Sequence, residues 1–237
     1  MNQRANISCC IALLLAALSL PACSASFSEA AGFEPVILKN PVPADALSID
    51  TLFAPRESRF DILRGDHLGE TLILTTTRED DRATITRTLE SGTVLNTQRI
   101  RLQLDAAAET GFENNERNVI VRLSPRQALW PISGSTQNMR IRLPRLDKPD
   151  KLKERGTATS TTTIESIDLL ETPDGPIEAV RVRTVFESDL RAATARRVTD
   201  RWYTNELGLV AERWDEIVKA FGLTVEQSAR TIRLRVE

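Results

Sequence analysis

Residues 72–77 read LILTTT, and residues 84–89 read TITRTL after the acidic turn EDD at 79–81. Both runs are rich in strand-forming residues and end at turn residues, a pattern typical of two strands joined by a hairpin. Comparable runs recur at 94–104, 118–123, 137–143, 157–169, 177–187, 198–203 and 231–236. The sequence therefore predicts a mainly β fold, a curved antiparallel meander with few or no long helices.

The tripeptide Ile-Arg-Leu occurs at 100–102, 141–143 and 232–234. An antiparallel strand with one wet face alternates apolar and polar residues. We expect the Ile and Leu of each copy to face the core and the Arg to face water.

One segment fits two structures. Its apolar residues fall at helical spacing, and Asp215 and Lys219 are placed for an i,i+4 ion pair. These apolar residues are Val210, Ala211, Trp214, Ile217, Val218 and Phe221. The resemblance described below favours a strand instead, so residues 210–221 remain open between helix and strand.

The N-terminal stretch has the features of an export signal. Arg4 precedes the apolar run ISCCIALLLAALSL at 7–20, which is too short for a stable transmembrane helix. We predict a signal peptide over residues 1–22.

The residues that follow resemble a bacterial lipobox, in which a small residue precedes a cysteine that becomes acylated. Leu20, Ala22 and Cys23 match this pattern, and Pro21 departs from it. The resemblance implies lipidation of Cys23 and a membrane anchor on the periplasmic side of the outer membrane. The alternative is ordinary cleavage near Ser24, which would give a soluble periplasmic or secreted protein.

The exported chain divides into two parts. Residues 23–58 are rich in Pro, Ala and Ser and predict an extended tether, because proline opposes both helix and central strand. Residues 59–237 predict a single antiparallel β domain.

Composition excludes several functions. The formal net charge is −2 with no clustered basic run, which argues against nucleic-acid binding. All three cysteines (Cys9, Cys10 and Cys23) precede the predicted β domain, which therefore has no disulfide and no thiol nucleophile.

Sequence motifs for catalysis are also missing. The single histidine, His67, lies between Gly65 and Gly69 in a predicted turn, and no hydrolase, phosphate-binding or metalloprotease motif occurs. The acidic run at 79–81 lacks the spacing of a calcium loop. We predict no enzyme activity, no metal and no cofactor.

Residues 172–212 resemble a pattern of uncharacterised secreted bacterial β-sheet proteins. A Pro-x-Gly turn precedes a strand with Ala-Val-x-Val, a later strand carries Trp-Tyr, and a loop ends in Gly-Leu-Val. The matching positions are Pro173, Gly175, Ala179, Val180, Val182, Trp202, Tyr203, Gly208, Leu209 and Val210. The likeness extends to half-barrel periplasmic lipoprotein carriers, and so implies a half-barrel-like curved sheet.

If residues 198–203 form a strand, Trp202 and Tyr203 point to opposite faces. We expect one of them to pack in the core and the other to cover a sheet edge or a partner surface. Asp174 and Gly175 read as a hairpin turn.

Two functions remain. The first is a non-enzymatic envelope lipoprotein that binds an apolar ligand, such as a lipid or a lipoprotein, on an open concave face of Leu, Ile and Val. The alternative is a structural or assembly partner of another envelope protein, with a filled core and an exposed sheet face.

Overall fold

The computed structural model describes residues 33–40, 42–43, 46–104, 106–173 and 175–235. The predicted signal peptide and Cys23 lie outside these residues. The described elements are β1 (Val36–Lys39), α2 (Ile49–Phe53), β2 (Arg56–Gly65), β3 (Thr71–Glu79), β4 (Arg82–Leu89), β5 (Val94–Gln103), β6 (Ala106–Asn114), β7 (Val119–Ser124), β8 (Ala128–Trp130), β9 (Thr136–Pro144), β10 (Leu152–Thr172), β11 (Gly175–Leu190), β12 (Thr194–Thr204), β13 (Gly208–Ala220) and β14 (Leu223–Arg235). The predicted mainly β, antiparallel fold is confirmed.

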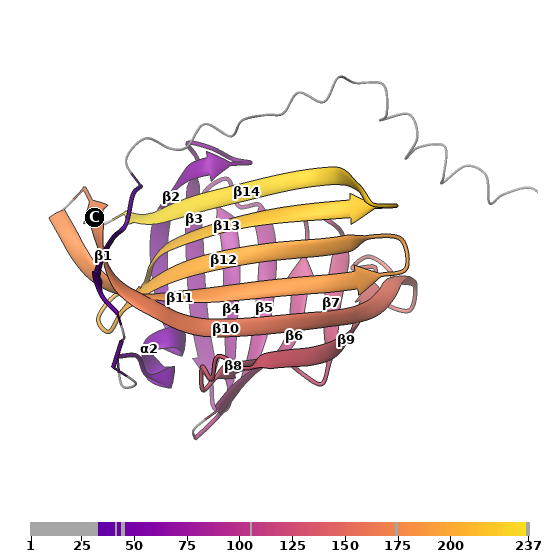
Figure 1. Cartoon of the computed structure of the whole chain (residues 1–237), viewed down its shortest axis with the longest axis horizontal. Coiled ribbons are helices and arrows are strands. Elements are labelled where there is room, and N and C mark those ends of the chain that lie inside the picture. Colours follow the sequence, from indigo (N-terminus) through magenta and orange to yellow (C-terminus); the bar gives the residue numbers. More distant parts are fainter. Residues whose placement is uncertain (1–32, 41, 44–45, 105, 174, 236–237) are drawn as a thin grey trace, which may run out of the picture.

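Twelve of these strands form a closed barrel (Figure 1). Strands β2 to β7 and β9 to β14 each pair antiparallel with the next, and β14 returns to pair with β2. At this closure Ile232 lies opposite Ile62, and Leu234 lies opposite Phe60. The expected half-barrel is therefore wrong, because the last strand of the meander, β14, pairs with its first strand, β2. Pairing satisfies the backbone groups that two free edges would have left open.

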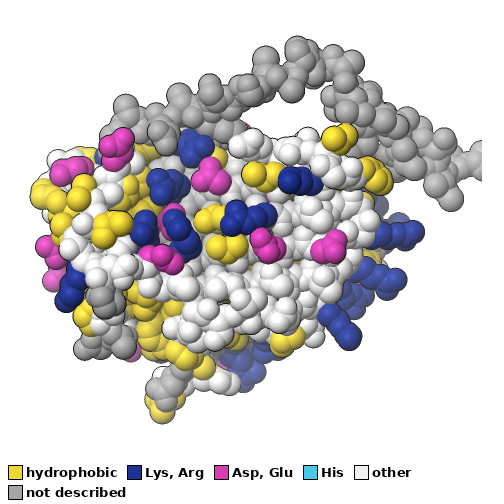
Figure 2. Space-filling view, in the orientation of Figure 1, with side chains coloured by type: hydrophobic (Ala, Val, Ile, Leu, Met, Phe, Trp, Pro, Cys, Tyr) yellow, Lys and Arg dark blue, Asp and Glu magenta, His cyan; other side chains and the backbone are white. Residues whose placement is uncertain are grey.

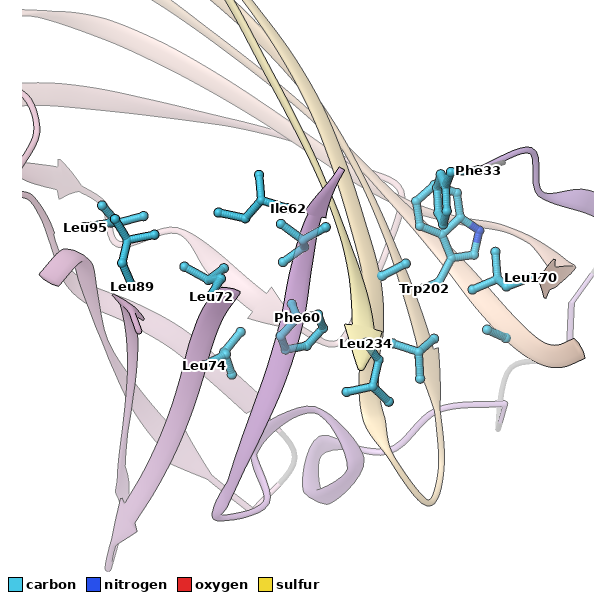
Figure 3. Close-up of a cluster of buried hydrophobic side chains, with 14 residues drawn as sticks. Phe33, Phe60, Ile62, Leu72, Leu74, Leu89, Leu95, Leu170, Trp202 and Leu234 are labelled. Carbon is cyan, nitrogen blue, oxygen red and sulfur yellow. The ribbon is translucent and has the colours of Figure 1, made fainter. Parts of the chain in front are cut away.

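Side chains alternate between the barrel interior and the outer face. The three Ile-Arg-Leu copies show this directly, because Ile100, Ile141 and Ile232 are buried while Arg101 and Arg142 are exposed. The expected orientation of the repeats is confirmed. Figure 3 shows the interior cluster contributed by β2 to β5, which includes Phe60, Ile62, Leu72, Leu74, Leu89 and Leu95.

Residues 210–221 are strand up to Ala220, and the helical reading is wrong. Strand β13 pairs with β12 on one side and with β14 on the other. The expected ion pair between Asp215 and Lys219 is replaced by one between Asp215 and Arg64, with 3.3 Å between Oδ1 and Nη1.

Part of the segment expected as a tether packs on the barrel. Strand β1 pairs with β10, and α2 follows it. Phe33, Leu47 and Phe53 from this segment are buried in three different apolar clusters. Prolines did not prevent this, because they lie outside β1 and α2.

One end of the barrel is filled by apolar side chains from α2 and β8. Ile49, Leu52 and Phe53 of α2 pack with Trp130 of β8 and Ile100 of β5. Within the described residues, no helix has the length and apolar character to cross a membrane.

Candidate functional site

The middle of the barrel interior holds a charged network. The Glu212 Oε2 atom of β13 lies 2.6 Å from Arg201 Nε of β12 and 3.2 Å from Arg87 Nη2 of β4. Strand alternation aims all three side chains inward, and they connect opposite walls of the barrel. A buried carboxylate held between two arginines is well compensated.

The network sets the protonation of its members. Burial alone would raise the pKa of Glu212, but the positive charges of Arg87 and Arg201 outweigh it and hold the pKa at about 2. Burial raises the pKa of Glu109 on β6, which accepts a 2.7 Å hydrogen bond from Gln98. Glu212 is thus ionised across the physiological range, whereas Glu109 gains protons more readily than an ordinary glutamate.

A second group of interior side chains lies farther along β12 and β13. The Arg197 guanidinium stacks 4.0 Å from the centre of the Trp214 ring, and Arg230 approaches the same ring at 5.8 Å. Glu216 pairs with Arg117 of the turn between β6 and β7, with 2.6 Å between Oε1 and Nη2. These contacts fill the interior with paired charges and an aromatic ring.

One small pocket lies in the interior beside the charged network. A pocket beside Arg87, Arg201 and Tyr203 has a volume of about 50 Å³, room for one or two water molecules. Apolar interior side chains such as Phe60 and Leu74 are buried by their neighbours. Around this pocket the interior is therefore packed, with charged side chains beside apolar ones.

Trp202 and Tyr203 point to opposite faces of β12. Trp202 is fully buried on the outer face, under the ring of Phe33 at a centroid distance of 5.3 Å (Figure 3). Its indole Nε1 donates a 2.9 Å hydrogen bond to Asp168 Oδ2. Tyr203 lines the interior beside Val180 and Leu47, where burial raises its pKa. Both residues serve packing in this structure, and a binding role for either stays a prediction.

The polar turns singled out in the sequence lie apart from this network. His67 has a positive φ of 66° in the turn between β2 and β3, and its Nδ1 lies 2.9 Å from Glu70 Oε1. Asp81 pairs with Arg101 at 3.0 Å. The structure brings neither His67 nor Asp81 together with Trp202 or Tyr203.

The outer surface carries an exposed apolar hairpin that sequence reasoning missed. We call residues 217–229 the β13–β14 arm. Phe221 at its tip is 97% exposed, Leu223 66% and Val225 54%. Phe221 and Gly222 both have positive φ, 51° and 79°, as a two-residue hairpin turn requires. A bulky residue rarely adopts this conformation.

The arm also presents an open strand edge. Strand β2 ends at Gly65, opposite Arg230, so the β14 residues 223–229 pair with β13 on one side only. Among the described residues no strand covers their other side. The stretch LTVEQSA at 223–229 contains one charged residue, the exposed Glu226, which pairs with Arg117. Natural proteins usually protect such an edge with charges, proline or a covering element.

A groove of about 440 Å³ adjoins the arm on the outer face of β10 to β13. It is lined by Thr159, Glu187, Asp189 and Arg196, and it reaches the arm at Ile217. The charged middle of this face is visible in Figure 2. The sequence left residues 210–221 open between helix and strand, so it revealed neither this edge nor its tip.

No family profile and no curated protein sequence matches the chain. Two solved structures can be aligned with the chain. One is a candidate lipoprotein from Parabacteroides distasonis, with 11% identity, a TM-score of 0.44, and coverage of 78% of this chain and 98% of that one. The other is a candidate exported protein with a YmcC-like fold from Bacteroides fragilis, with 11% identity, a TM-score of 0.43, and coverage of 78% and 99%.

Proposed function

We propose that this protein is a non-enzymatic lipoprotein of the cell envelope that acts as an assembly partner. It is exported by the signal in residues 1–22 and anchored through Cys23 on the periplasmic side of the outer membrane. The β13–β14 arm docks an extended strand of another envelope protein. The single observation that carries this proposal is the open strand edge at residues 223–229, whose one charged residue, Glu226, is paired, beside the exposed Phe221.

The chemistry of the arm supports this partner. An extended segment that adds to a strand edge gains backbone hydrogen bonds, and its alternate side chains gain apolar contacts. Here the free backbone groups of residues 223–229 supply the hydrogen bonds, while Val225 and Leu223 supply exposed apolar surface. The adjoining groove at Ile217 gives a partner a second contact.

The other function expected from the sequence was binding of an apolar ligand. That function needs an apolar cavity of several hundred cubic ångströms for a lipid chain. The interior pocket of about 50 Å³ is far smaller than this, and the groove of about 440 Å³ lies on the outer face and is lined partly by the charged Glu187, Asp189 and Arg196. Both observations support assembly over carriage. Lipid mass spectrometry on protein purified gently from its envelope distinguishes the two functions. A stoichiometric non-covalent lipid would favour binding of an apolar ligand over assembly.

The assembly function is tested by site-specific photo-crosslinking in intact envelopes. A photoreactive phenylalanine analogue replaces Phe221 at the arm, and in a matched control it replaces Leu104. Leu104 is 92% exposed in the turn after β5, away from the arm. We expect a discrete adduct with another protein from position 221 and none from position 104.

Two outcomes contradict the proposal. The first is the same adduct pattern from both positions, or none from either. The second is an adduct of twice the chain mass from position 221, which would identify a second copy of this protein as the occupant.

A further inference from the structure

Arginines face one another across three strands at one end of the barrel. Arg122 of β7 lies directly opposite Arg142 of β9, and Arg142 lies directly opposite Arg155 of β10. Arg140 sits two residues from Arg142 on the same outer face, and all four side chains are exposed. Figure 2 shows Lys and Arg side chains gathered along the lower right edge, near the part of the barrel where Figure 1 labels β7 and β9.

The four arginines, which we call the arginine row, have no ion-pair partner in the described part of the chain. Of the nearby carboxylates, Glu187 pairs with Arg196 and Asp147 with Arg145, while Asp189 of β11 lies opposite Thr157 and not opposite an arginine of the row. Glu154 accepts a hydrogen bond from the backbone N–H of Arg155. Like charges directly opposite in a sheet are destabilising. A row that is left uncompensated within the chain therefore points to a negative partner outside it.

We propose that the arginine row binds an anionic membrane surface through the phosphates of lipid headgroups. The planar guanidinium group matches phosphate oxygens in pairs. Adjacent strands are about 4.8 Å apart, so a row over three strands extends about 10 Å, which is wider than one phosphate ion.

The residues around the row favour a membrane over a soluble polyanion. Leu152 at the start of β10 is 40% exposed and lies between Lys151 and Lys153. An apolar side chain flanked by basic ones is suited to the interface, where the apolar group enters the headgroup region and the charges meet phosphate. This inference is independent of the arm, which lies on other strands.

Vesicle co-sedimentation tests the inference on the exported chain carrying Cys23→Ser, so that no acyl chain contributes. We compare vesicles of phosphatidylcholine alone with vesicles that contain half phosphatidylglycerol, at low and at high salt. The triple variant Arg122→Gln/Arg142→Gln/Arg155→Gln removes the row. We expect binding to the anionic vesicles only, weakened by salt, and at least about tenfold weaker for the triple variant.

The matched control is Arg78→Gln/Arg101→Gln/Arg196→Gln. It removes the same total charge from three strand arginines that already pair with Asp50, Asp81 and Glu187. We expect its partition to stay within about twofold of the parent chain. Equal losses in both triple variants would reduce the effect to net charge and overturn the inference. Binding to an anionic polysaccharide but not to anionic vesicles would overturn it in favour of a soluble polymer.

Discussion

Glu212 is buried in the barrel interior and forms ion pairs with two arginines. Replacing it with Gln removes the charge that Arg87 and Arg201 share. Breaking a buried ion pair costs several kcal/mol, because the partner charges lose their compensation. We expect Glu212→Gln to lower the free energy of unfolding by about 3 kcal/mol at pH 7, measured by chemical denaturation.

The same substitution has a defined pH dependence. The folded-state pKa of Glu212, about 2, lies below the ordinary value of 4.5, so its stabilisation is present above pH 4.5. This stabilisation is lost as the pH falls from 4.5 to about 2. The difference in stability between the parent protein and Glu212→Gln should therefore shrink between pH 4.5 and 2. A difference that does not change with pH would show that the carboxylate charge is not its source.

Glu109 is the matched control for Glu212, because it lies in the same interior and allows the same substitution. Burial raises the pKa of Glu109 above the ordinary value of 4.5. The ionised form of Glu109 therefore destabilises the fold as the pH rises above 4.5. Gln at this position keeps an oxygen that accepts from Gln98. We expect Glu109→Gln to be at least as stable as the parent protein at pH 7. A loss as large as that of Glu212→Gln would contradict the assigned roles.

Alternation in the sequence predicts that Trp202 and Tyr203 face opposite sides, but it cannot predict what they contact. The hydrogen bond from Trp202 to Asp168 joins residues on strands far apart in the chain. Phe33, which covers Trp202, comes from a segment whose prolines suggested a tether. Such contacts depend on the strand register, which a single sequence does not contain.

At the scale of elements, the approach of β10 to β11 is limited by Gly156. A Cβ atom at this position would lie 1.9 Å from the backbone carbonyl oxygen of Asp189. Backbone cannot move aside as a flexible side chain can, so we expect Gly156→Ala to lower the free energy of unfolding by about 1–3 kcal/mol, measured by denaturant unfolding.

Gly111 of β6 provides the control for Gly156. A Cβ atom there would meet nothing within 4 Å. We expect Gly111→Ala to change the free energy of unfolding by less than about 0.5 kcal/mol. If both variants lose stability equally, the close approach to Asp189 is not the cause. The loss would then come from a general effect of replacing Gly by Ala in these strands.

Strand β13 shows why one element could not be predicted. Its inward positions carry Glu212, Trp214 and Glu216, which pair with arginines across the barrel. Charges at inward positions remove the period of two from the hydrophobic pattern. The remaining apolar residues, which include the exposed Phe221, then fall at helical spacing by coincidence. Sequence periodicity is reliable only where the buried face is apolar.

For the whole molecule, lipidation of Cys23 is the first point to test. We expect intact mass to show an acylated Cys23 as the mature N-terminus, and Cys23→Ser to release the protein from membranes that are washed with high salt. Salt is needed because the arginine row would otherwise retain part of the protein. The physical reason is that stable anchoring needs acyl chains, and basic residues alone give reversible binding.

Cys10→Ser is the control for this experiment, since Cys10 lies within the predicted signal peptide and outside the lipobox. It should leave both the mature mass and the membrane fraction unchanged. Release of the parent protein by salt alone would show that Cys23 carries no lipid, and would support the soluble periplasmic or secreted alternative.

The sequence predicts the strands and their antiparallel, meandering order, but it does not predict closure. A packed sandwich, an open half-barrel and a closed barrel all alternate apolar and polar residues. Closure depends on the pairing of Ile62 with Ile232, residues that belong to the first and last strands of the barrel. No local pattern marks such a pair, because each residue reads as an ordinary inward position of its own strand.

This closing pair also dictates an order of events during biogenesis. A chain that crosses a membrane from its N-terminal end delivers β2 first and β14 after every other strand of the barrel. Until Arg230–Arg235 arrives, the edge of β2 has no partner, and Phe60 and Ile62 lack the residues that cover them. A half-delivered chain therefore exposes an unpaired strand edge and apolar side chains until its last strand arrives.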